Sequence, residues 1–196
     1  MTSTPQRTIA TTAVFAALII ASSLVSIPAP GGVPIVLQNA FCVLAGLVLG
    51  PKRGTLPVVV FLVLGLVGLP VLPGSRTVLS AIAGPTAGYL IGYLFSPMVA
   101  GLLSAPFLRK PNKAVMTFGV ALACLLTIVV QYICGVAGLM VVSGMSFGDA
   151  VVAQLTYIPG AIIKTIVMTI ATVAVLRALP GIREDLQRTP TAAAHV

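Results

Sequence analysis

The stretch GAIIKTIVMTIATVAVLRAL (Gly160–Leu179) places Lys164 inside an apolar run that contains no acidic residue. A run of this length is sufficient to cross the hydrocarbon core of a bilayer. A lone ammonium in hydrocarbon costs roughly 3 kcal/mol on insertion scales, so it needs a partner or a route to water. Two interpretations are open. Either Lys164 faces the helix bundle and binds an anionic ligand, or its flexible stem carries the ammonium to the lipid headgroups.

The composition of the whole chain indicates an integral membrane protein. Of 196 residues, 58% are hydrophobic and 7% are charged, whereas a soluble domain carries about 25% charged residues. Continuous apolar runs favour helices over a β-barrel, whose strands alternate in hydrophobicity. The net charge of +8 is typical of basic loops that face the cytoplasm and anionic lipid. We therefore expect an all-α protein built as one compact bundle.

Six apolar segments are candidates for transmembrane helices. They run approximately Ile9–Ile27, Ile35–Leu49, Thr55–Leu69, Val78–Leu103, Ala114–Val142 and Gly160–Leu179. The second and third are short for a bilayer that asks for about 20 residues, which leaves them tilted, irregular or sheltered by neighbours. The first resembles a signal peptide, but its apolar run is longer than an ordinary signal core and other spans follow it. We interpret it as a retained helix.

Basic residues fall mostly on one side of a chain that crosses six times. That side carries Arg7, Lys52, Arg53, Arg109, Lys110, Lys113, Arg177, Arg183 and Arg188. The opposite side carries Arg76 and Asp149, with Lys164 just inside its boundary. The positive-inside rule then predicts that both termini are cytoplasmic. Lys164 would lie toward the extracytoplasmic face, where a nutrient would be captured.

Several kinds of chemistry are disfavoured by what the sequence lacks. His195 is the one histidine and lies in a polar tail, so a histidine-based metal site within the membrane is excluded. Cys42, Cys124 and Cys134 have no CxxC spacing and are better explained as small buried residues. No GxxxxGK[ST] phosphate loop is present, and no carboxylate lies within a span. The chain therefore needs an outside source of energy for any transport.

Polar side chains cluster near the predicted outer face. They are Gln38, Asn39, Thr86, Tyr89, Gln131, Tyr132, Tyr157 and Lys164. Amide, hydroxyl and ammonium groups suit a small anionic molecule with an apolar body. Structural explanations also exist. Tyr93 and Tyr132 suit a membrane interface, Gln131 could tie helices together, and Gly84–Pro85 could kink the fourth span.

Four segments together resemble the BioY family, the biotin-binding S-components of energy-coupling-factor (ECF) transporters. They are VPIVLQNAFCVLAGLVLGPKRG (Val33–Gly54), GLPV (Gly68–Val71), GPTAGYLIGY (Gly84–Tyr93) and YIPGAIIK (Tyr157–Lys164). Each motif is weak by itself, but their joint order covers nearly the whole chain.

The resemblance implies a single S-component domain over residues 1–196, with short cytoplasmic tails at about 1–8 and 180–196. It implies six transmembrane helices in the cytoplasmic membrane and an extracytoplasmic pocket for biotin. It also implies three partner subunits, namely a transmembrane coupling protein and two cytoplasmic ATPases. ATP would be used by these partners, and the chain itself would need no cofactor.

Two positions depart from the family pattern. An acidic residue usually follows the Pro-Gly before the last span, and Ala161 stands there in this chain. The loss removes a ligand contact, or a partner for the lysine, and leaves Lys164 freer for a carboxylate. The loop before GPT is usually glycine-rich, and here it carries Arg76. Arg76 either replaces a ligand contact or is a solvated loop charge.

A stripe of small residues on the first span predicts a helix-packing face. Ala13, Ala17 and Ala21 recur at four-residue intervals and permit the close approach of another helix. From the residues alone, packing within the bundle is the first explanation. The resemblance favours docking of the coupling protein, because S-components use small residues of the first helix for that contact.

We expect a membrane subunit that captures biotin and releases it when an ATP-driven partner acts. Two alternatives belong to other classes, namely an intramembrane enzyme and a structural membrane subunit without a ligand. An enzyme would need a serine, cysteine or lysine nucleophile, and no paired base is evident.

Overall fold

The computed structural model describes residues 5–27, 33–179, 181–183 and 186. Glu184, Arg188 and His195 lie outside the described residues, as do residues 28–32 and most of the predicted C-terminal tail. The first helix begins at Pro5, within the predicted N-terminal tail.

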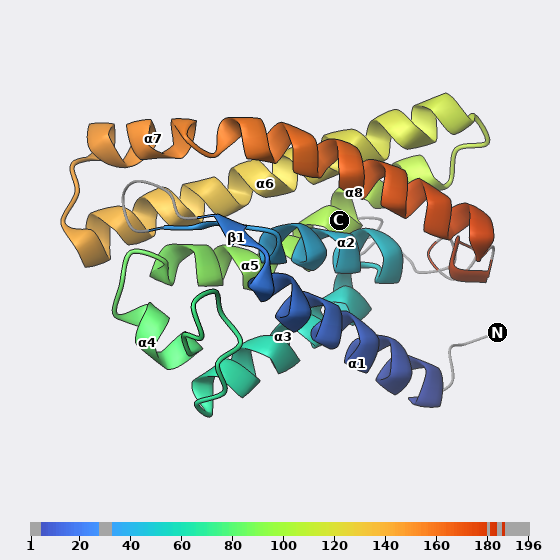
Figure 1. The fold of residues 1–196 in the computed structure, drawn as a ribbon. Helices are drawn as coiled ribbons and strands as arrows, with labels where there is room; N and C mark the ends of the chain where they lie inside the picture. Colours follow the sequence, from blue (N-terminus) through green and yellow to red (C-terminus); the bar gives the residue numbers. More distant parts are fainter. Residues whose placement is uncertain (1–4, 28–32, 180, 184–185, 187–196) are drawn as a thin grey trace, which may run out of the picture.

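Helices dominate the described chain (Figure 1). They are α1 (Pro5–Ala21), α2 (Gln38–Leu49), α3 (Pro51–Leu66), α4 (Val78–Ile82), α5 (Ala87–Leu108), α6 (Lys113–Ser143), α7 (Phe147–Leu155) and α8 (Ile158–Ala178). A 3-10 turn, η1 (Ser22–Leu24), follows α1, and two short strands, β1 (Ser26–Ile27) and β2 (Ile35–Val36), pair antiparallel.

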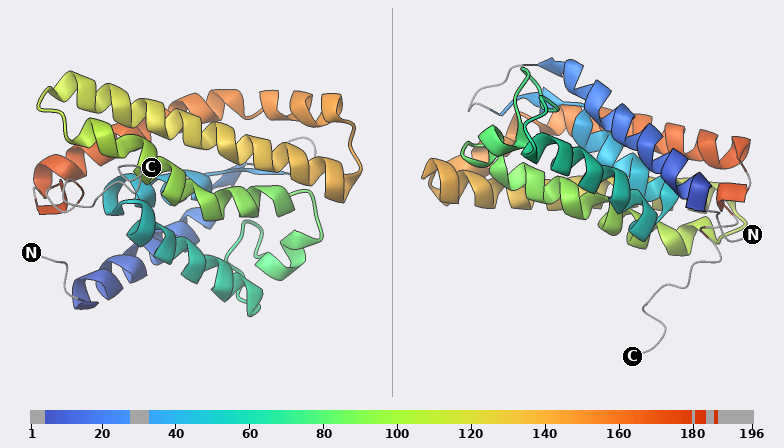
Figure 2. Two further views of the ribbon diagram at one scale, coloured as in Figure 1. Left: turned by 180° about the vertical axis from the view of Figure 1, so that it is seen from behind. Right: turned by 90° about the horizontal axis from the view of Figure 1, so that it is seen from below.

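The helices form a layered bundle. Figure 1 shows α6, α7 and α8 along one side, with α6 and α8 side by side. On the other side α1 and α3 cross each other, as the left view of Figure 2 shows from behind. Between these layers lie α2 and α5, which also contact each other. The bundle therefore has a central helix, α2, that packs against both layers.

The shortness of α2 is explained by its position. All of its 12 residues except Phe41 and Leu49 are buried. At Gly46 a Cβ would collide with the backbone of Pro97 on α5, so only glycine permits this approach. A helix enclosed by protein need not match the bilayer thickness, because its ends do not face lipid. This is the sheltered arrangement that the sequence left open for the second span.

Among the described residues, four helices are long and apolar enough to cross a membrane. They are Pro5–Leu24, Ala87–Leu108, Lys113–Ser143 and Ile158–Ala178. Their outward faces are apolar, as on α8, where Ile162, Ile163, Ile166 and Ile170 are exposed. Such a surface suits lipid rather than water. The chain is therefore an all-α membrane protein with a small two-stranded addition.

Two of the predicted spans are wrong in extent. The first span was expected to continue to Ile27, but α1 ends at Ala21 because the chain turns through η1 into β1. The second was expected from Ile35, which instead pairs in β2 with Ile27. Both strands contain β-branched isoleucine, which suits extended backbone.

The fourth predicted span, Val78–Leu103, is two helices rather than one. Thr77 caps α4 by accepting a hydrogen bond from Ser80 N at 3.1 Å, and α4 ends at Ile82. The chain then turns at Gly84–Thr86 before α5 begins. Pro85 lacks an N–H and cannot continue the helix ladder, so the GPT segment breaks the span instead of merely kinking it.

The structure also contains α7, which the sequence analysis did not predict. Ser146 caps it by accepting a hydrogen bond from Asp149 N at 3.2 Å. This helix fills the connection between α6 and α8. The remaining spans agree closely with α3, α6 and α8, although α3 begins earlier, at Pro51, after a left-handed Gly50 (φ 81°).

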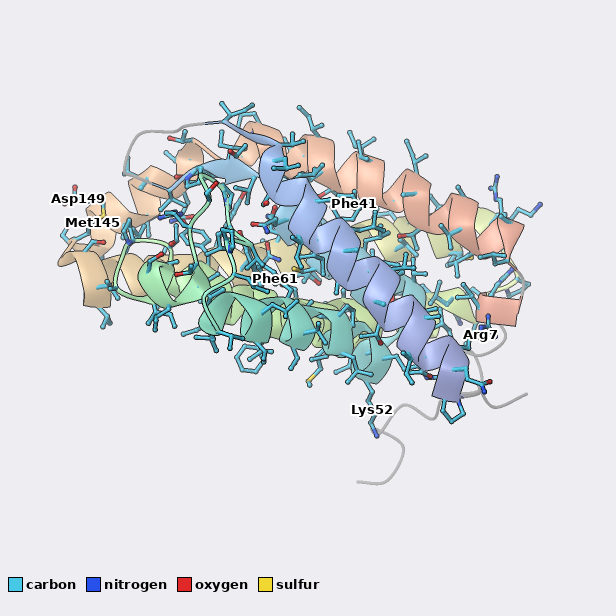
Figure 3. All side chains as sticks on the ribbon, turned by 60° about the horizontal axis from the view of Figure 1, so that its bottom comes forward. Arg7, Phe41, Lys52, Phe61, Met145 and Asp149 are labelled. Carbon is cyan, nitrogen blue, oxygen red and sulfur yellow. The ribbon has the colours of Figure 1, made fainter. Side chains whose placement is uncertain are left out.

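The two ends of the molecule differ in charge. Figure 3 shows Arg7 and Lys52 at one end and Asp149 at the opposite end. Lys52 lies where α2 turns into α3, and Arg7 lies near the start of α1. Elements that are distant in sequence are thus gathered into one basic end.

Candidate functional site

Four of the predicted site residues line one small pocket. Gln38 begins α2, Arg76 lies in the loop before α4, Thr86 precedes α5, and Tyr89 lies in its first turn. Val33, Leu72, Leu90 and Tyr93 supply much of the apolar wall. We call this site the Arg76 pocket. Apolar walls with a few convergent polar groups are typical of small-molecule sites.

Gln38 supplies the Arg76 pocket with an unused acceptor. The side chain is 0% exposed. Its Nε2 donates to Val71 O at 2.7 Å and to Ile19 O at 3.2 Å. In the described part of the chain, its Oε1 has no hydrogen-bond partner. A buried unpaired acceptor costs about 1–3 kcal/mol, so a ligand N–H at this position would relieve that cost.

Arg76 brings a positive charge to the pocket on a tight loop. The loop is closed by a single β-bridge between Leu72 and Arg76, and Gly74 and Ser75 have left-handed backbone. Arg76 is half-buried, and its Nε donates to Pro73 O over a long 3.4 Å. This weak bond leaves most of the guanidinium's five N–H donors available for an anion.

Three tyrosines from different helices pack beside the pocket. Tyr89 OH donates to Gln154 Oε1 at 2.8 Å, and Tyr157 OH donates to Val33 O at 2.6 Å. Tyr132 OH donates to Tyr157 O at 3.1 Å. The rings of Tyr89 and Tyr157 meet edge-on with centroids 6.4 Å apart. These contacts fix α5, α6 and α7 around the start of α8.

Three of the other predicted site residues belong to a separate chain of hydrogen bonds. Lys164 Nζ donates to Asn39 Oδ1 at 2.9 Å, and Asn39 Nδ2 donates to Gln131 Oε1 at 3.1 Å. Gln131 Nε2 donates to Ser96 Oγ at 2.6 Å. We call these four residues the Lys164 network. It joins α2, α5, α6 and α8, so Gln131 does tie helices together.

The position of Lys164 favours the bundle-facing interpretation. Its side chain is half-buried and its ammonium lies against α2. The one acidic residue in the described part of the chain, Asp149, accepts a hydrogen bond from Ser146 Oγ at 2.6 Å. The described acceptor of Lys164 is therefore a neutral amide. An ammonium has three donors, so an anionic ligand could bind there.

The eight predicted site residues thus divide into two adjoining groups. The Arg76 pocket holds Gln38, Arg76, Thr86 and Tyr89, and the Lys164 network holds Asn39, Gln131 and Lys164. Tyr157 contacts Tyr89 on the pocket side. The two groups meet at α2, whose first residue belongs to one and whose second residue belongs to the other.

Three polar residues near the site were absent from the predicted set. Gln154 and Ser96 are buried partners of Tyr89 and Gln131, and Tyr93 lines the Arg76 pocket. Interpreting Tyr93 as an interface residue is wrong, because it is only 7% exposed. Ser96 and Tyr93 could have been identified from the sequence, because their spacing from Tyr89 places all three residues on the same face of α5.

The Arg76 pocket is nearly filled by its own side chains. Its open volume is ≈ 20 Å³, and a single water needs roughly 10–15 Å³. A ligand larger than a water or two therefore requires lining residues to move.

The structure also bears on metals and on the small-residue stripe. Within the described residues no three His, Cys, Asp or Glu side chains come together as a metal site.

Ala13, Ala17 and Ala21 are exposed, whereas Ala16 and Ile19 on the other face of α1 are buried. The stripe therefore does not pack within the bundle, and that explanation is wrong.

Comparisons with known proteins match nearly the whole chain to one family. The BioY family model matches residues 1–181. A "Biotin transporter BioY" from Rhizobium etli is 38% identical over 178 residues, covering 89% of this chain and 95% of the relative. One from Rhodobacter capsulatus is 37% identical over 172 residues, covering 83% of this chain and 89% of the relative.

A solved structure has the same fold. It is a crystal structure of the S-component for biotin from an ECF-type ABC transporter. The two chains superpose with a TM-score of 0.81 at 32% identity, covering 89% of this chain and 95% of that chain.

Proposed function

The chain belongs to the BioY family, and we propose that it captures biotin as the S-component of an ECF transporter. The match to relatives named biotin transporters, over 89% and 83% of this chain, carries this proposal. That family consists of membrane-embedded transporter components, so the chain is not an enzyme. Transport would be driven by partner subunits that hydrolyse ATP.

The arrangement of polar groups supports a biotin site. Biotin carries a carboxylate at one end and a ureido ring, with two N–H donors and a carbonyl, at the other. We propose that Gln38 Oε1 accepts a ureido N–H, because it is a buried acceptor without a partner among the described residues. Thr86 and Tyr89 lie in the same pocket and can bond the remaining ureido atoms.

We assign the carboxylate of biotin to Lys164, with Arg76 as a second cation. Lys164 bonds a neutral amide among the described residues, so an anion would lower the energy of its desolvated ammonium. Asn39 and Gln131 hold the lysine in place, and Tyr157 closes the aromatic side of the site. Entry of biotin would displace the Arg76 loop, because the pocket is nearly filled without it.

Radiolabelled biotin binding to the purified chain in detergent tests this function. We expect saturable binding that unlabelled biotin displaces and that vitamins lacking the ureido ring do not. No binding of biotin to a folded, monodisperse chain would contradict the proposal and favour a structural subunit.

We propose further that the chain crosses the membrane six times with both termini in the cytoplasm. The basic end that contains Arg7 and Lys52 supports this orientation. Ser75→Cys should react with a membrane-impermeant thiol reagent from outside, and Lys113→Cys should react only after permeabilisation. The parent chain, whose cysteines are Cys42, Cys124 and Cys134, is the control. The reverse pattern of labelling would overturn the topology.

We also propose that the exposed stripe Ala13, Ala17 and Ala21 docks the transmembrane coupling protein. Ala17→Trp should keep biotin binding but lose ATP-dependent uptake in a reconstituted complex, because the indole blocks close helix approach. Ala16→Trp is the matched control, since Ala16 is 4% exposed and a bulky side chain there should impair folding. Intact uptake by Ala17→Trp would show that the docking surface lies elsewhere.

A further inference from the structure

Gln154, near the end of α7, is a buried amide to which the biotin site gives no role. It is 7% exposed. Its Oε1 accepts a hydrogen bond from Tyr89 OH at 2.8 Å, and its Nε2 donates to Ala150 O at 3.2 Å. Tyr89 lines the Arg76 pocket, whereas Gln154 does not. Any effect of Gln154 on a ligand in that pocket must therefore pass through Tyr89.

The direction of the hydrogen bond between Tyr89 and Gln154 is fixed from the amide end. The carbonyl oxygen of Ala150 can only accept, so the Gln154 atom beside it is the NH₂ group. Oε1, which can only accept, then faces Tyr89, and the tyrosine must donate. A phenol has one proton. Because that proton is used by Gln154, the Tyr89 oxygen can act toward a ligand only as an acceptor.

The ring of Tyr89 is held by helices rather than by the loop that carries Arg76. A Cβ at Gly135 would collide with this ring, so the ring lies directly against the backbone of α6. The ring of Tyr157 meets it edge-on, with centroids 6.4 Å apart. A ligand that displaces the Arg76 loop therefore leaves the Tyr89–Gln154 hydrogen bond, and with it the direction of donation, in place.

We propose that Gln154 is a positioning residue that makes Tyr89 a hydrogen-bond acceptor and so selects ligands that present an N–H to it. This inference rests on the proposed capture of biotin. With Gln38 Oε1 assigned to one ureido N–H, the Tyr89 oxygen accepts the other. The Thr86 hydroxyl, whose bond to Ala81 O is long at 3.4 Å, is left to donate to the ureido carbonyl. A ligand with an oxygen in place of the N–H at Tyr89 brings two lone pairs together and is rejected.

The test compares the binding of biotin with that of its two cyclic carbamate analogues, in each of which a ring oxygen replaces one ureido N–H. The full chain in detergent should bind biotin at least about tenfold tighter than either carbamate. Gln154→Leu should reduce this preference to about twofold for one carbamate, because the freed Tyr89 proton can then donate to the ring oxygen. The preference over the other carbamate, which loses the N–H at Gln38, should be unchanged. An unchanged preference over both would overturn the inference.

Two further variants separate positioning from packing. In a Tyr89→Phe background there is no hydroxyl to orient, so adding Gln154→Leu should cause little further loss of biotin affinity. Additive losses in this double-mutant cycle would mean that Gln154 acts independently of Tyr89, and the inference would fail. Gln154→Glu keeps an acceptor for Tyr89 whether or not the carboxyl is protonated, so it should retain the preference of the parent. Loss of the preference in this variant would also contradict the inference.

Ser146→Ala is the matched control for a loosened α7. It removes the side chain that caps this helix by accepting from Asp149 N at 3.2 Å, and it leaves Gln154 intact. The unfolding temperature should fall while the preference for biotin is retained. Equal loss of the preference would show that the packing of α7 sets the selectivity, which would overturn the inference.

The parent chain distinguishes the two levels of failure. If it bound biotin and both carbamates equally, this inference alone would fail. If the folded parent bound none of the three, the proposed function would fail and this inference with it. Circular dichroism and size-exclusion chromatography of each variant separate lost binding from lost folding.

Discussion

The Arg76 pocket and the Lys164 network adjoin each other, but they use their polar groups differently. In the network, Asn39 and Gln131 each bond to neighbours on other helices. In the pocket, Gln38 Oε1 has no partner among the described residues and Arg76 makes one long hydrogen bond to Pro73 O. The network therefore mainly holds helices together, whereas the pocket has hydrogen-bonding groups that are available to a ligand.

Lys164 does not fit this distinction, because it combines features of both groups. It belongs to the network through Asn39, yet it is a half-buried cation whose described acceptor is neutral. A structural role alone would not require a charge, because an uncharged donor could bond Asn39 at lower desolvation cost. Replacing Lys164 should therefore affect both stability and biotin binding, whereas replacing one of the other residues should affect mainly one of the two.

The largest expected effect on biotin affinity is that of Lys164→Ala. Removing a hydrogen bond to a charged group costs about 1.5–3 kcal/mol, roughly ten- to a hundredfold in Kd. Equilibrium binding of radiolabelled biotin measures this loss. Lys113→Ala removes an exposed lysine outside the site and should leave the Kd unchanged. If Lys164→Ala bound biotin as tightly as the parent, the lysine would be structural only.

Gln131→Leu should break the network rather than the pocket. It leaves the buried Asn39 Nδ2 without its acceptor and removes one of the two hydrogen bonds of Ser96 Oγ, which still donates to Gly92 O. Leaving buried polar groups unpaired costs about 1–3 kcal/mol, so the unfolding temperature should fall clearly. Biotin affinity, measured below that temperature, should fall less than in Lys164→Ala.

Ser96→Ala is the milder companion of this variant, because it removes one interhelical hydrogen bond, from Gln131, together with a bond within α5 to Gly92 O, and little volume. An interhelical hydrogen bond in a membrane averages about 0.6 kcal/mol, so a small shift in unfolding temperature is expected. The opposite pattern in Gln131→Leu, with unchanged stability and abolished biotin binding, would make Gln131 a direct ligand residue.

Arg76→Ala should weaken biotin binding less than Lys164→Ala does, and it should have almost no effect on stability. The side chain lies on a loop and makes one long bond to Pro73 O at 3.4 Å. As a second cation near the carboxylate, it should contribute about tenfold in Kd at low salt, falling as salt screens it. Arg76→Lys should restore part of the affinity. Full affinity in Arg76→Ala at low salt would mark Arg76 as a solvated loop charge.

The membrane class and most of the long helices could be predicted from sequence, because long apolar runs bounded by glycine, proline and charge have few alternatives. The prediction of helices failed where turn-forming or polar residues interrupt the apolar pattern. The GPT turn at Gly84–Thr86 interrupts an otherwise continuous apolar run, and the α7 helix is short and contains Gly148, Asp149 and Gln154. Neither segment has the length from which a membrane span is recognised.

The candidate site was predictable as a set of residues but not as an arrangement. Asn39 and Lys164 are 125 residues apart, and only the packing of α2 against α8 brings them together. Nor could sequence alone say that Gln38 and Asn39, which are adjacent, belong to different groups. That division depends on the position of α2 at the centre of the bundle, where successive side chains face different helices.

Calorimetric titration of the purified chain with biotin and with biotinamide, its neutral analogue, tests whether Lys164 captures the carboxylate of biotin. Capture of an anionic ligand by Lys164 predicts one binding site, with biotin binding at least about tenfold tighter than the amide. Lys164→Ala should abolish that preference while still binding both compounds weakly. Equal affinity of the parent chain for biotin and biotinamide would rule out capture of the carboxylate by Lys164, and no binding of either to a folded chain would rule out biotin capture altogether.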